Sequence, residues 1–370
     1  MRIVMLGGSG NAGRAIATLL APTLGSGDEL VIAGRDRDRL AAAREAVVTA
    51  ARVETRRVDL DDRAASRAAL DGAGLVIVTA ARPDLVGALA REALEAGADW
   101  FDTLLSTATK WEALRRLEPR ILASGRCFVT DGGFHPGLPA VLARRAAEYL
   151  DELHTADVMA GLRIDWKADT LADSTVDEML DEFSDFDLTA WVDGRQQRLR
   201  WSQCPRVDFG PPIGTQVVVP MPLEEMRLLP ELLAGLRRCG LYITGFGPVM
   251  DYLVLPVVTL LAPVRRLRPA VRRLTRWSMG RLATAPPPHR LVVQLDAEGR
   301  KDGSPARVRL SVAGEDGYLV TAAPAVACLR QLRDGTIRRP GLHLQGHLVE
   351  PGPTLAALAE AGLEVVDLSR

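Results

Sequence analysis

The sequence predicts an α/β fold, in which a doubly wound parallel sheet of the Rossmann type is joined to a second α+β domain with a mixed or antiparallel sheet. Short apolar runs alternate with helical runs over about the first 130 residues, a pattern typical of parallel sheets. A glycine-rich turn lies between the first apolar run and the first helical run. After about residue 150 the alternation ends, and Asp-Gly turn signals separate the later strands.

Six strands that alternate with helices predict the parallel sheet of the first domain. The predicted strands are residues 2–6, 30–34, 53–58, 75–78, 100–102 and 127–129. The predicted helices are residues 14–20, 36–51, 63–70, 85–96 and 110–123. Residues 2–6 are apolar and partly β-branched, as expected for a strand that helices cover on both faces.

The second half of the chain has a different pattern. Short strands and Gly/Pro-rich loops are expected over residues 154–235, and largely helical structure over residues 236–283. A proline-rich break at residues 285–288 separates this region from an antiparallel part. The elements predicted beyond it are strands 290–296, 307–312 and 318–322 and a helix at 324–332, with turn signals at Glu298-Gly299, Asp302-Gly303 and Asp316-Gly317.

The composition is that of a globular protein without excess charge. Of the 370 residues, 47% are hydrophobic, and 46 Lys and Arg nearly balance 47 Asp and Glu, so we expect no nucleic-acid partner. The four cysteines form no CxxC pair, and we expect neither a disulfide framework nor a zinc site. The apolar N-terminal run is too short for a signal peptide, and a cytoplasmic protein is expected.

The glycine-rich turn has the G-x-G-x-x-G pattern of a dinucleotide site. It follows a predicted strand and opens a helix, which is the context that this pattern requires: Gly8-Ser9-Gly10-Asn11-Ala12-Gly13. We expect Gly8 to allow the tight turn, Gly10 to let a pyrophosphate approach the backbone, and Gly13 to let helix and strand pack closely. The helix N-terminus then offers free N–H groups to the phosphates.

The end of the second strand favours NADP(H) over NAD(H). NAD enzymes usually place an acidic residue there, whereas this chain has Gly34 followed by Arg35, whose guanidinium suits a 2′-phosphate. Arg37 or Arg39 is expected to assist, and Asp36 to cap the next helix. The alternative is that these arginines merely lie at a solvated helix start.

Other strand ends supply further predicted contacts. Asp59, after the third strand, is placed near the adenine, and the small residues after the fourth strand are placed near the nicotinamide: Thr79, Ala80 and Ala81. Asp102, at the end of the fifth strand with Thr103, either faces the nicotinamide or forms a structural turn.

These residues together resemble the saccharopine dehydrogenase-like NADP-dependent oxidoreductases. The resemblance rests on the glycine turn, on Gly34-Arg35, and on the segments Thr79–Pro83, Ala96–Thr103 and Gly132–Leu138. It covers residues 1–140 and extends thinly to Gly341–Leu368. It implies a bilobal enzyme, often dimeric through the sheet of its second domain. The implied reaction is hydride transfer between NADPH and a C=N bond.

The predicted domains follow from this resemblance. Residues 1–135 form the cofactor domain, to which residues 341–370 return, and residues 136–340 form a substrate-binding and dimerisation domain with an apolar and basic helical insertion at about 236–283. A homodimer is therefore expected.

The loop after the sixth strand carries the first candidate for acid–base catalysis. His135, whose reference pKa of ~6.5 suits proton transfer near neutrality, stands where the family carries Asp. Alternatively, it only hydrogen-bonds to backbone. Asp131 is expected to orient a substrate amine or pair with His135, or else to be a strand-end turn residue, and Gly133 is expected to contact the cofactor. Lys110 is expected on a helix surface.

The remaining histidines do not predict a metal site. His343 and His347 have the spacing of a helical pair, but Gly341, Gly346 and nearby prolines argue against a helix, so no metal is expected.

Residues 242–281 are unusual because an apolar run, broken by Pro256 and Pro263, is followed by six arginines. These are Arg265, Arg266, Arg268, Arg272, Arg273 and Arg276. The apolar run is shorter than the ~20 residues that a spanning helix needs. One interpretation is contact with a membrane surface or with an apolar, acidic substrate. The other is a helical insertion that packs on the sheet or in a dimer interface.

The sequence as a whole therefore predicts an NADP(H)-dependent oxidoreductase that acts on a C=N or CH–NH bond of a small or medium substrate. Two alternatives remain: a reductase of C=C or C=O bonds in an apolar substrate, and a sensor or partner protein that binds NADP without turnover.

Overall fold

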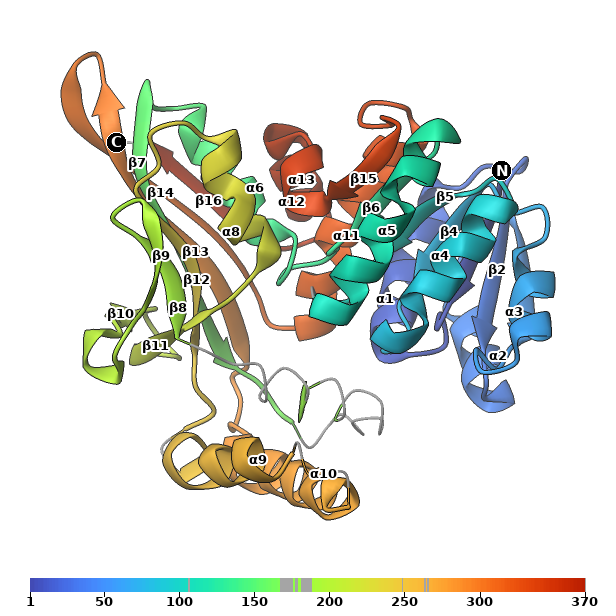
Figure 1. The fold of residues 1–370 in the computed structure, drawn as a ribbon, viewed down its shortest axis with the longest axis horizontal. Coiled ribbons are helices and arrows are strands. Elements are labelled where there is room, and N and C mark those ends of the chain that lie inside the picture. Colours follow the sequence, from blue (N-terminus) through green and yellow to red (C-terminus); the bar gives the residue numbers. More distant parts are fainter. Residues whose placement is uncertain are drawn as a thin grey trace. The chain divides into compact units, whose positions relative to one another are not determined.

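A computed structural model of the chain describes residues 1–105, 107–166, 176, 179–180, 188–247, 249–262, 264 and 266–369. It contains two compact units: Met1–Val141 with Tyr318–Gly362, and Leu142–Gly317 with Leu363–Arg370. Each unit has its own sheet (Figure 1).

The first unit is built on a parallel seven-stranded sheet with the order β15-β6-β5-β4-β1-β2-β3. Its strands are β1 Arg2–Leu6, β2 Glu29–Gly34, β3 Arg52–Arg57, β4 Leu75–Val78, β5 Asp99–Asp102, β6 Cys127–Thr130 and β15 Gly341–Leu344. The strand order reverses between β1 and β4, and ligands of open α/β sheets bind at such a switch point. This confirms the predicted Rossmann sheet.

Helices bury both faces of this sheet. They are α1 Asn11–Leu20, α2 Arg37–Glu45, α3 Arg63–Leu70, α4 Val86–Glu95, α5 Ala108–Ala123, α11 Gly317–Arg333, α12 Gln345–Leu348 and α13 Pro351–Glu360. Helices α3, α4 and α5 share one apolar cluster with Val4 and Leu6 of β1. Ile3 and Met5, which point to the opposite face, have no exposed surface either. Burial on both faces explains why β1 is a continuous apolar run.

The second unit is built on a mixed sheet with the order β10-β11-β12-β7-β13-β14-β16. Its strands are β7 Glu152–Arg163, β8 Thr189–Val192, β9 Arg195–Arg198, β10 Arg206–Asp208, β11 Thr215–Met221, β12 Arg238–Thr244, β13 Arg290–Lys301, β14 Ser304–Gly314 and β16 Glu364–Ser369. Its helices are α8 Glu224–Leu232, α9 Leu255–Leu261 and α10 Arg268–Ser278, and α6 Leu138–Ala147 leads into it from the first unit. The β12–β7 pair is parallel, and the other neighbours along this order are antiparallel.

The element predictions for the second half need correction. Residues 318–322 are not a strand, because they begin helix α11, and Pro324 lies inside that helix instead of starting it. Proline disfavours a helix interior, but most of α11 after its first turn is buried, so packing outweighs the local preference. The region 236–283 is not helical throughout, since β12 occupies its start.

The chain also crosses between the units differently from the prediction. Helix α11 was predicted to belong to the second domain, within residues 136–340. From Tyr318 onward it lies in the first unit. Of residues 341–370, β15 pairs with β6 in the Rossmann sheet, whereas β16 pairs with β14 in the second sheet. Gly299, expected in a turn, lies within β13, where an added Cβ would meet the carbonyl oxygen of Glu152.

Candidate active site

The glycine turn after β1 is held by backbone hydrogen bonds to the next strand. The N–H groups of Gly7 and Gly8 donate to the carbonyl of Ala33 at 3.0 and 3.1 Å, and the N–H of Gly10 donates to the carbonyl of Gly7 at 2.9 Å. The left-handed conformation belongs to Gly7, with φ +86°, so Gly7 and not Gly8 provides the tight turn. A Cβ on Gly13 would lie 2.5 Å from the Gly7 carbonyl oxygen, so helix and turn touch there.

The N-terminus of α1 is open to an anion. Gly10 is its N-cap residue and makes no side-chain cap hydrogen bond, and the first turn contains no acidic residue. Ser9, Asn11 and Ala12 lie at this helix start, on either side of Gly10. The free N–H groups and the dipole of such a helix start favour phosphate.

Three exposed arginines follow β2: Arg35, Arg37 and Arg39. Asp36 accepts hydrogen bonds from the N–H groups of Asp38 and Arg39 at 2.9 and 3.0 Å, which confirms that it caps α2. The guanidinium of Arg39 donates to the Asn11 side chain at 3.1 Å, so it reaches the glycine turn. Arg39 was expected only to assist Arg35.

The residues around these arginines are tightly fitted. The Asn11 amide donates to the Tyr318 hydroxyl at 2.9 Å, which connects the glycine turn to helix α11. Gly34 lacks a side chain because the Ser9 hydroxyl fills that space, where an added Cβ would clash with it. The absence of a side chain at Gly34 therefore leaves room for Ser9.

The loop after β4 packs directly on the glycine turn. The N–H of Thr79 donates to the Leu6 carbonyl at 2.9 Å, and an added Cβ on Gly7 would lie 2.5 Å from the backbone nitrogen of Ala80. Arg82 pairs with Asp61 at 2.7 Å, and this bond leads the causes that lower the pKa of Asp61.

Other predicted cofactor contacts lie at the same edge of the sheet. Ala81 follows directly in the loop after β4, and Asp59 is exposed after β3, where it accepts a bond from the N–H of Asp61 at 3.2 Å. The structure thus gathers these predicted cofactor residues at the carboxyl edge of the parallel sheet, although their contact with a cofactor stays a prediction.

A buried charge cluster lies at the ends of β5 and β6. The ammonium of Lys110, in the first turn of α5, donates to Asp102 at 2.9 Å, to Asp131 at 2.6 Å and to the Leu104 carbonyl at 2.5 Å. The side chains of Lys110, Asp102 and Asp131 have no exposed surface. All three ammonium protons are therefore used, which is what a buried charge requires.

The two carboxylates keep Lys110 charged. Burial by itself would lower the pKa of Lys110, but the charges of Asp102 and Asp131 outweigh it and raise that pKa above its ordinary value. Asp102 is held further by the Trp100 indole N–H at 2.8 Å and by the Leu104 N–H at 3.2 Å.

This cluster corrects the prediction for Lys110. Lys110 is not on the helix surface; it shares a buried stripe with Leu114, Leu117 and Ile121, at helical spacing, which was the signal in the sequence. The buried carboxylate of Asp102 is bonded to Lys110 and Trp100, and its contact with the nicotinamide stays a prediction.

The loop after β6 is braced by hydrogen bonds to the end of β5 and to the start of α12. Asp131 takes a left-handed conformation with φ +59°, and the N–H of Gly132 donates to the Asp102 carbonyl at 2.8 Å. The buried amide of Gln345, at the start of α12, accepts from the Gly133 N–H at 3.2 Å and donates to the Gly133 carbonyl at 3.1 Å. The sequence analysis missed Gln345, since its partner is 212 residues away.

His135 lies in this braced loop. Its ring is partly buried and sits 3.8 Å, centroid to centroid, from the ring of Phe134. Burial lowers the pKa of His135 to about 4, so the free imidazole is neutral at pH 7. A neutral imidazole has a free ring nitrogen that can accept a proton.

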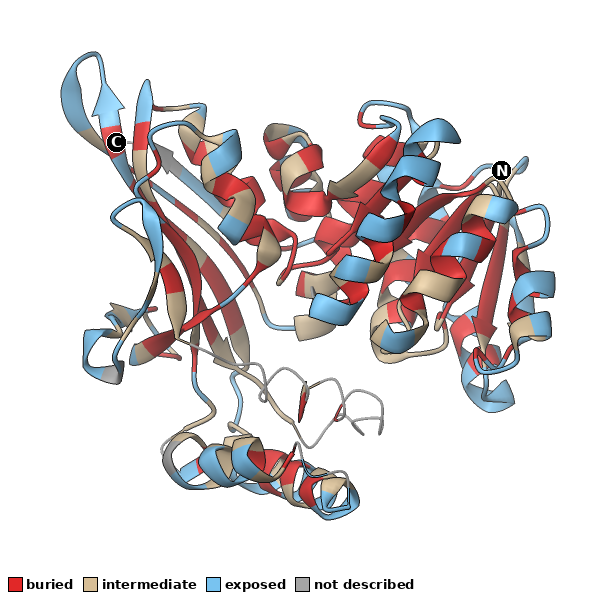
Figure 2. Cartoon of the chain, viewed as in Figure 1, coloured by how far each residue is buried: buried red, intermediate tan, exposed pale blue. Residues whose placement is uncertain are grey.

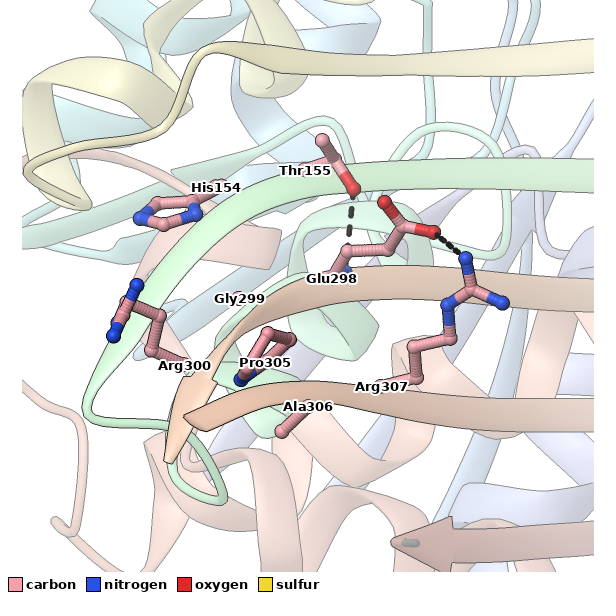
Figure 3. Close-up of a pocket in the computed structure, with 8 residues that line it drawn as sticks. All are labelled: His154, Thr155, Glu298, Gly299, Arg300, Pro305, Ala306 and Arg307. Carbon is pink, nitrogen blue, oxygen red and sulfur yellow. Dashed lines mark hydrogen bonds and ion pairs between the residues drawn. The ribbon is translucent and has the colours of Figure 1, made fainter. Parts of the chain in front are cut away.

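Two other features of the structure do not add to this site. Within the described ranges, no three His, Cys, Asp or Glu side chains cluster as metal ligands; His343 lies on β15 and His347 on the short α12. A surface hollow in the second unit is lined by residues of β7 and of the β13–β14 hairpin, among them His154 and Arg300. Figure 3 shows that its Glu298 is already paired with Arg307, at 2.8 Å.

Comparison with known proteins agrees with this architecture. Residues 3–129 match the family described as the saccharopine dehydrogenase NADP binding domain. No curated protein matches the chain. Apo saccharopine dehydrogenase (L-Glu forming) from Saccharomyces cerevisiae is similar over 100% of this chain and 99% of its own, with 13% identity and a TM-score of 0.68.

Two other solved structures are more distant. An engineered D-amino acid dehydrogenase bound to NADP+ covers 96% of this chain and 95% of its own at 12% identity, with a TM-score of 0.46. The C. glutamicum DAP dehydrogenase in complex with DAP covers 96% and 95% at 13% identity, also with a TM-score of 0.46.

The fold and the site define a Rossmann-type protein with a dinucleotide turn and a second, mixed-sheet unit. Residues 3–129 match the saccharopine dehydrogenase NADP binding domain family, and the whole chain shares its fold with saccharopine dehydrogenase. The resemblance that the sequence indicated is confirmed.

Proposed function

We propose that this chain is an NADP(H)-dependent oxidoreductase that transfers hydride to or from a C=N or CH–NH bond of a small or medium substrate. The observation that carries the proposal is the glycine turn, with the open N-terminus of α1 beside exposed Arg35 and Arg39. Phosphates suit the first feature and a 2′-phosphate the second. The family match supports the same cofactor.

The cofactor and the residues of this chain would have separate roles in the reaction. Bound NADPH supplies the hydride. His135 is the proposed acid–base group: the neutral imidazole accepts a proton from the CH–NH substrate in oxidation, and the imidazolium returns it in reduction. It is the titratable side chain of the braced loop that remains outside the Lys110 cluster. Lys110, which is itself bonded to Asp102, holds Asp131 and the start of that loop in place.

Cofactor titration tests the cofactor part of the proposal. We expect tighter binding of NADPH than of NADH, and we expect Arg35→Ser to weaken NADPH binding about 10- to 100-fold, the loss of one charged hydrogen bond. Arg44→Ser, an exposed arginine near the other end of α2, is the matched control and should change nothing. Preference for NADH would refute the proposed role of Arg35.

A second candidate is reduction of a C=C or C=O bond in an apolar substrate. It is favoured by the exposed apolar residues that gather between Val249 and Leu282. NADPH oxidation with keto acids plus amines, compared with enals and ketones, separates the two reactions. Tight NADPH binding without turnover in either assay would support a non-catalytic NADP-binding protein.

A further inference from the structure

His135 is the one partly exposed residue in a long buried stretch of the first unit. All residues from 127 to 143 are buried except His135. Figure 2 shows this buried region around β6 and α12. The loop after β6 therefore makes a single imidazole accessible, and whatever holds the loop in place also determines where that ring lies.

Residues 133–137 of this loop fold back on themselves. Gly133 and Gly137 have φ +123° and +120°, a region that glycine enters far more easily than other residues. An added Cβ on Gly137 would lie 2.6 Å from the carbonyl oxygen of Gly133, so the two ends of the loop touch. This backbone has left the ladder of the sheet, and the buried N–H and C=O of Gly133 therefore need partners from elsewhere.

The side chain of Gln345 supplies both partners. Its amide oxygen accepts from the Gly133 N–H at 3.2 Å, and its amide nitrogen donates to the Gly133 carbonyl at 3.1 Å. The pairing of β15 with β6 ends at Leu344 and Thr130, so this amide continues the ladder in the way that a peptide group would. The amide nitrogen also fills the space that a Cβ on Gly137 would need. Gln345, which has no exposed surface, thus contacts both ends of the loop.

The glutamine amide offers the Gly133 peptide a donor and an acceptor together. An apolar side chain could fill the space at position 345, but it would leave the buried N–H and C=O without these bonds, which is unfavourable. A glutamate would offer only acceptors once it is ionised. The peptide that Gln345 fixes leads directly into Phe134, whose ring lies 3.8 Å from the ring of His135, between centroids. The orientation of this peptide is therefore passed on to the imidazole.

We propose that Gln345 is a positioning residue for His135, because its amide fixes the Gly133 peptide and, through it, the loop that carries the imidazole. The inference rests on the proposed function, in which His135 exchanges a proton with the substrate. Gln345 acts through the loop and not on the substrate. Since Lys110 holds Asp131, the loop is fixed at two points, one from α5 and one from α12.

Titration of His135 by NMR, on the full chain with isotope-labelled histidine rings, tests the proposal without a substrate. Burial lowers the pKa of His135 to about 4, so a ring that leaves its place becomes hydrated and its pKa should move toward the ordinary ~6.5. We expect Gln345→Met, which keeps the volume and loses both bonds, to raise the pKa of His135 above ~5. The signal that disappears in His135→Gln identifies His135 among the five histidines.

Gln331→Met is the matched control, because Gln331 is a second buried glutamine of the first unit. Its side chain accepts from the N–H of Glu350 at 2.8 Å and donates to the Thr354 hydroxyl at 3.0 Å. Its loss should lower the melting temperature about as much as the loss of Gln345, since both changes leave buried groups unpaired. The pKa of His135 should nevertheless stay at about 4 in this variant.

Gln345→Glu is the conservative variant. Burial keeps its carboxyl protonated at low pH, and a protonated carboxyl donates and accepts as the amide does. The pKa of His135 should therefore stay at about 4 in this variant. As the pH rises further and the carboxyl at position 345 ionises, the ring signal of His135 should shift a second time.

Three results would overturn the proposal. One is an unchanged pKa of His135 in a Gln345→Met chain that still binds NADPH. Another is an equal rise in Gln331→Met, which would mean that any loosening of the unit hydrates the ring. If Gln345→Met does not fold, Gln345→Glu decides, and a His135 signal that shifts only once would count against positioning.

Turnover separates this inference from the proposed function. With an identified substrate, Gln345→Met should lower kcat about 10- to 100-fold, the usual effect of a misplaced reacting group, and leave the KM for NADPH unchanged. If His135→Gln leaves kcat unchanged, the proposed role of His135 in the reaction is wrong. The titration would still decide whether Gln345 positions its ring.

Discussion

Replacement of Lys110 is the most informative single change, because this buried lysine is paired with both Asp102 and Asp131. Lys110→Met keeps most of the side-chain volume and removes the charge. The buried carboxylates of Asp102 and Asp131 then both lose the ammonium to which they are bonded. Removing one partner of a buried ion pair costs about 3–5 kcal/mol, because the other charge is left unpaired. We expect a similar loss here.

That free energy translates into a large thermal shift. For a unit of this size, 1 kcal/mol lowers the melting temperature by about 2–4 °C, so Lys110→Met should lower it by about 6–20 °C. Lys301→Met is the matched control, since Lys301 is exposed at the end of β13 and should shift the melting temperature by less than about 2 °C.

The stability of the unmodified chain and of Lys110→Met should depend on pH in different ways. In the unmodified chain the pKa of Lys110 is raised on folding, so its stabilising contribution is present below the ordinary lysine pKa of ~10.4 and is lost as the pH rises through the raised value. In Lys110→Met, repulsion between two buried carboxylates raises the pKa of one of them, so the deficit should be smaller at pH 5 than at pH 8.

Calorimetry or circular dichroism across this pH range measures the deficit of Lys110→Met directly. A melting temperature that falls no further than in Lys301→Met, or a deficit that is equal at both pH values, would show that the cluster does not hold its charges as described. Lys110→Arg is a useful third variant. A planar guanidinium does not reproduce three bonds that meet at one point, so it should restore the charge but only part of the stability.

Two further predictions concern the glycine turn and the loop after β6. Gly13→Ala should abolish measurable NADPH binding in a fluorescence titration, because its Cβ would lie 2.5 Å from the Gly7 carbonyl, whereas Gly27→Ala, with open space around it, should bind normally. His135→Gln should lower kcat while leaving NADPH affinity unchanged. It should also reduce the acid sensitivity of stability, because a histidine whose pKa falls from ~6.5 to about 4 on folding costs stability as the pH drops through that window.

The Rossmann sheet was predictable because its sequence signals are local. Strand β1 is apolar on both faces, the glycine turn follows at once, and each later strand is separated from the next by one helix of ordinary length. The start of α2 was also predictable, because the side chain of Asp36 caps it. Such signals need only a few neighbouring residues.

The second unit was less predictable because its pairings are distant and its local signals conflict. Strand β7 takes its neighbours from β12 and β13, some eighty and more residues away, and β16 returns from the other end of the chain. Pro324 and the β-branched Val320 and Thr321 favour a strand followed by a helix start, but burial places all of them in one helix. Only tertiary packing decides between these outcomes.

The Lys110 cluster lies between these two cases, since its signal was present but faint. The basic residues of the whole chain are almost all arginine, and lysine occurs only at 110, 167 and 301. Lysine at a position where Leu114 and Leu117 continue the buried stripe suggests a small ammonium that is needed where several acceptors converge. The structure supplies those acceptors from β5 and β6, and the same strand ends begin the loop that carries His135. The stability of the sheet edge and the position of the proposed proton donor therefore depend on one buried charge.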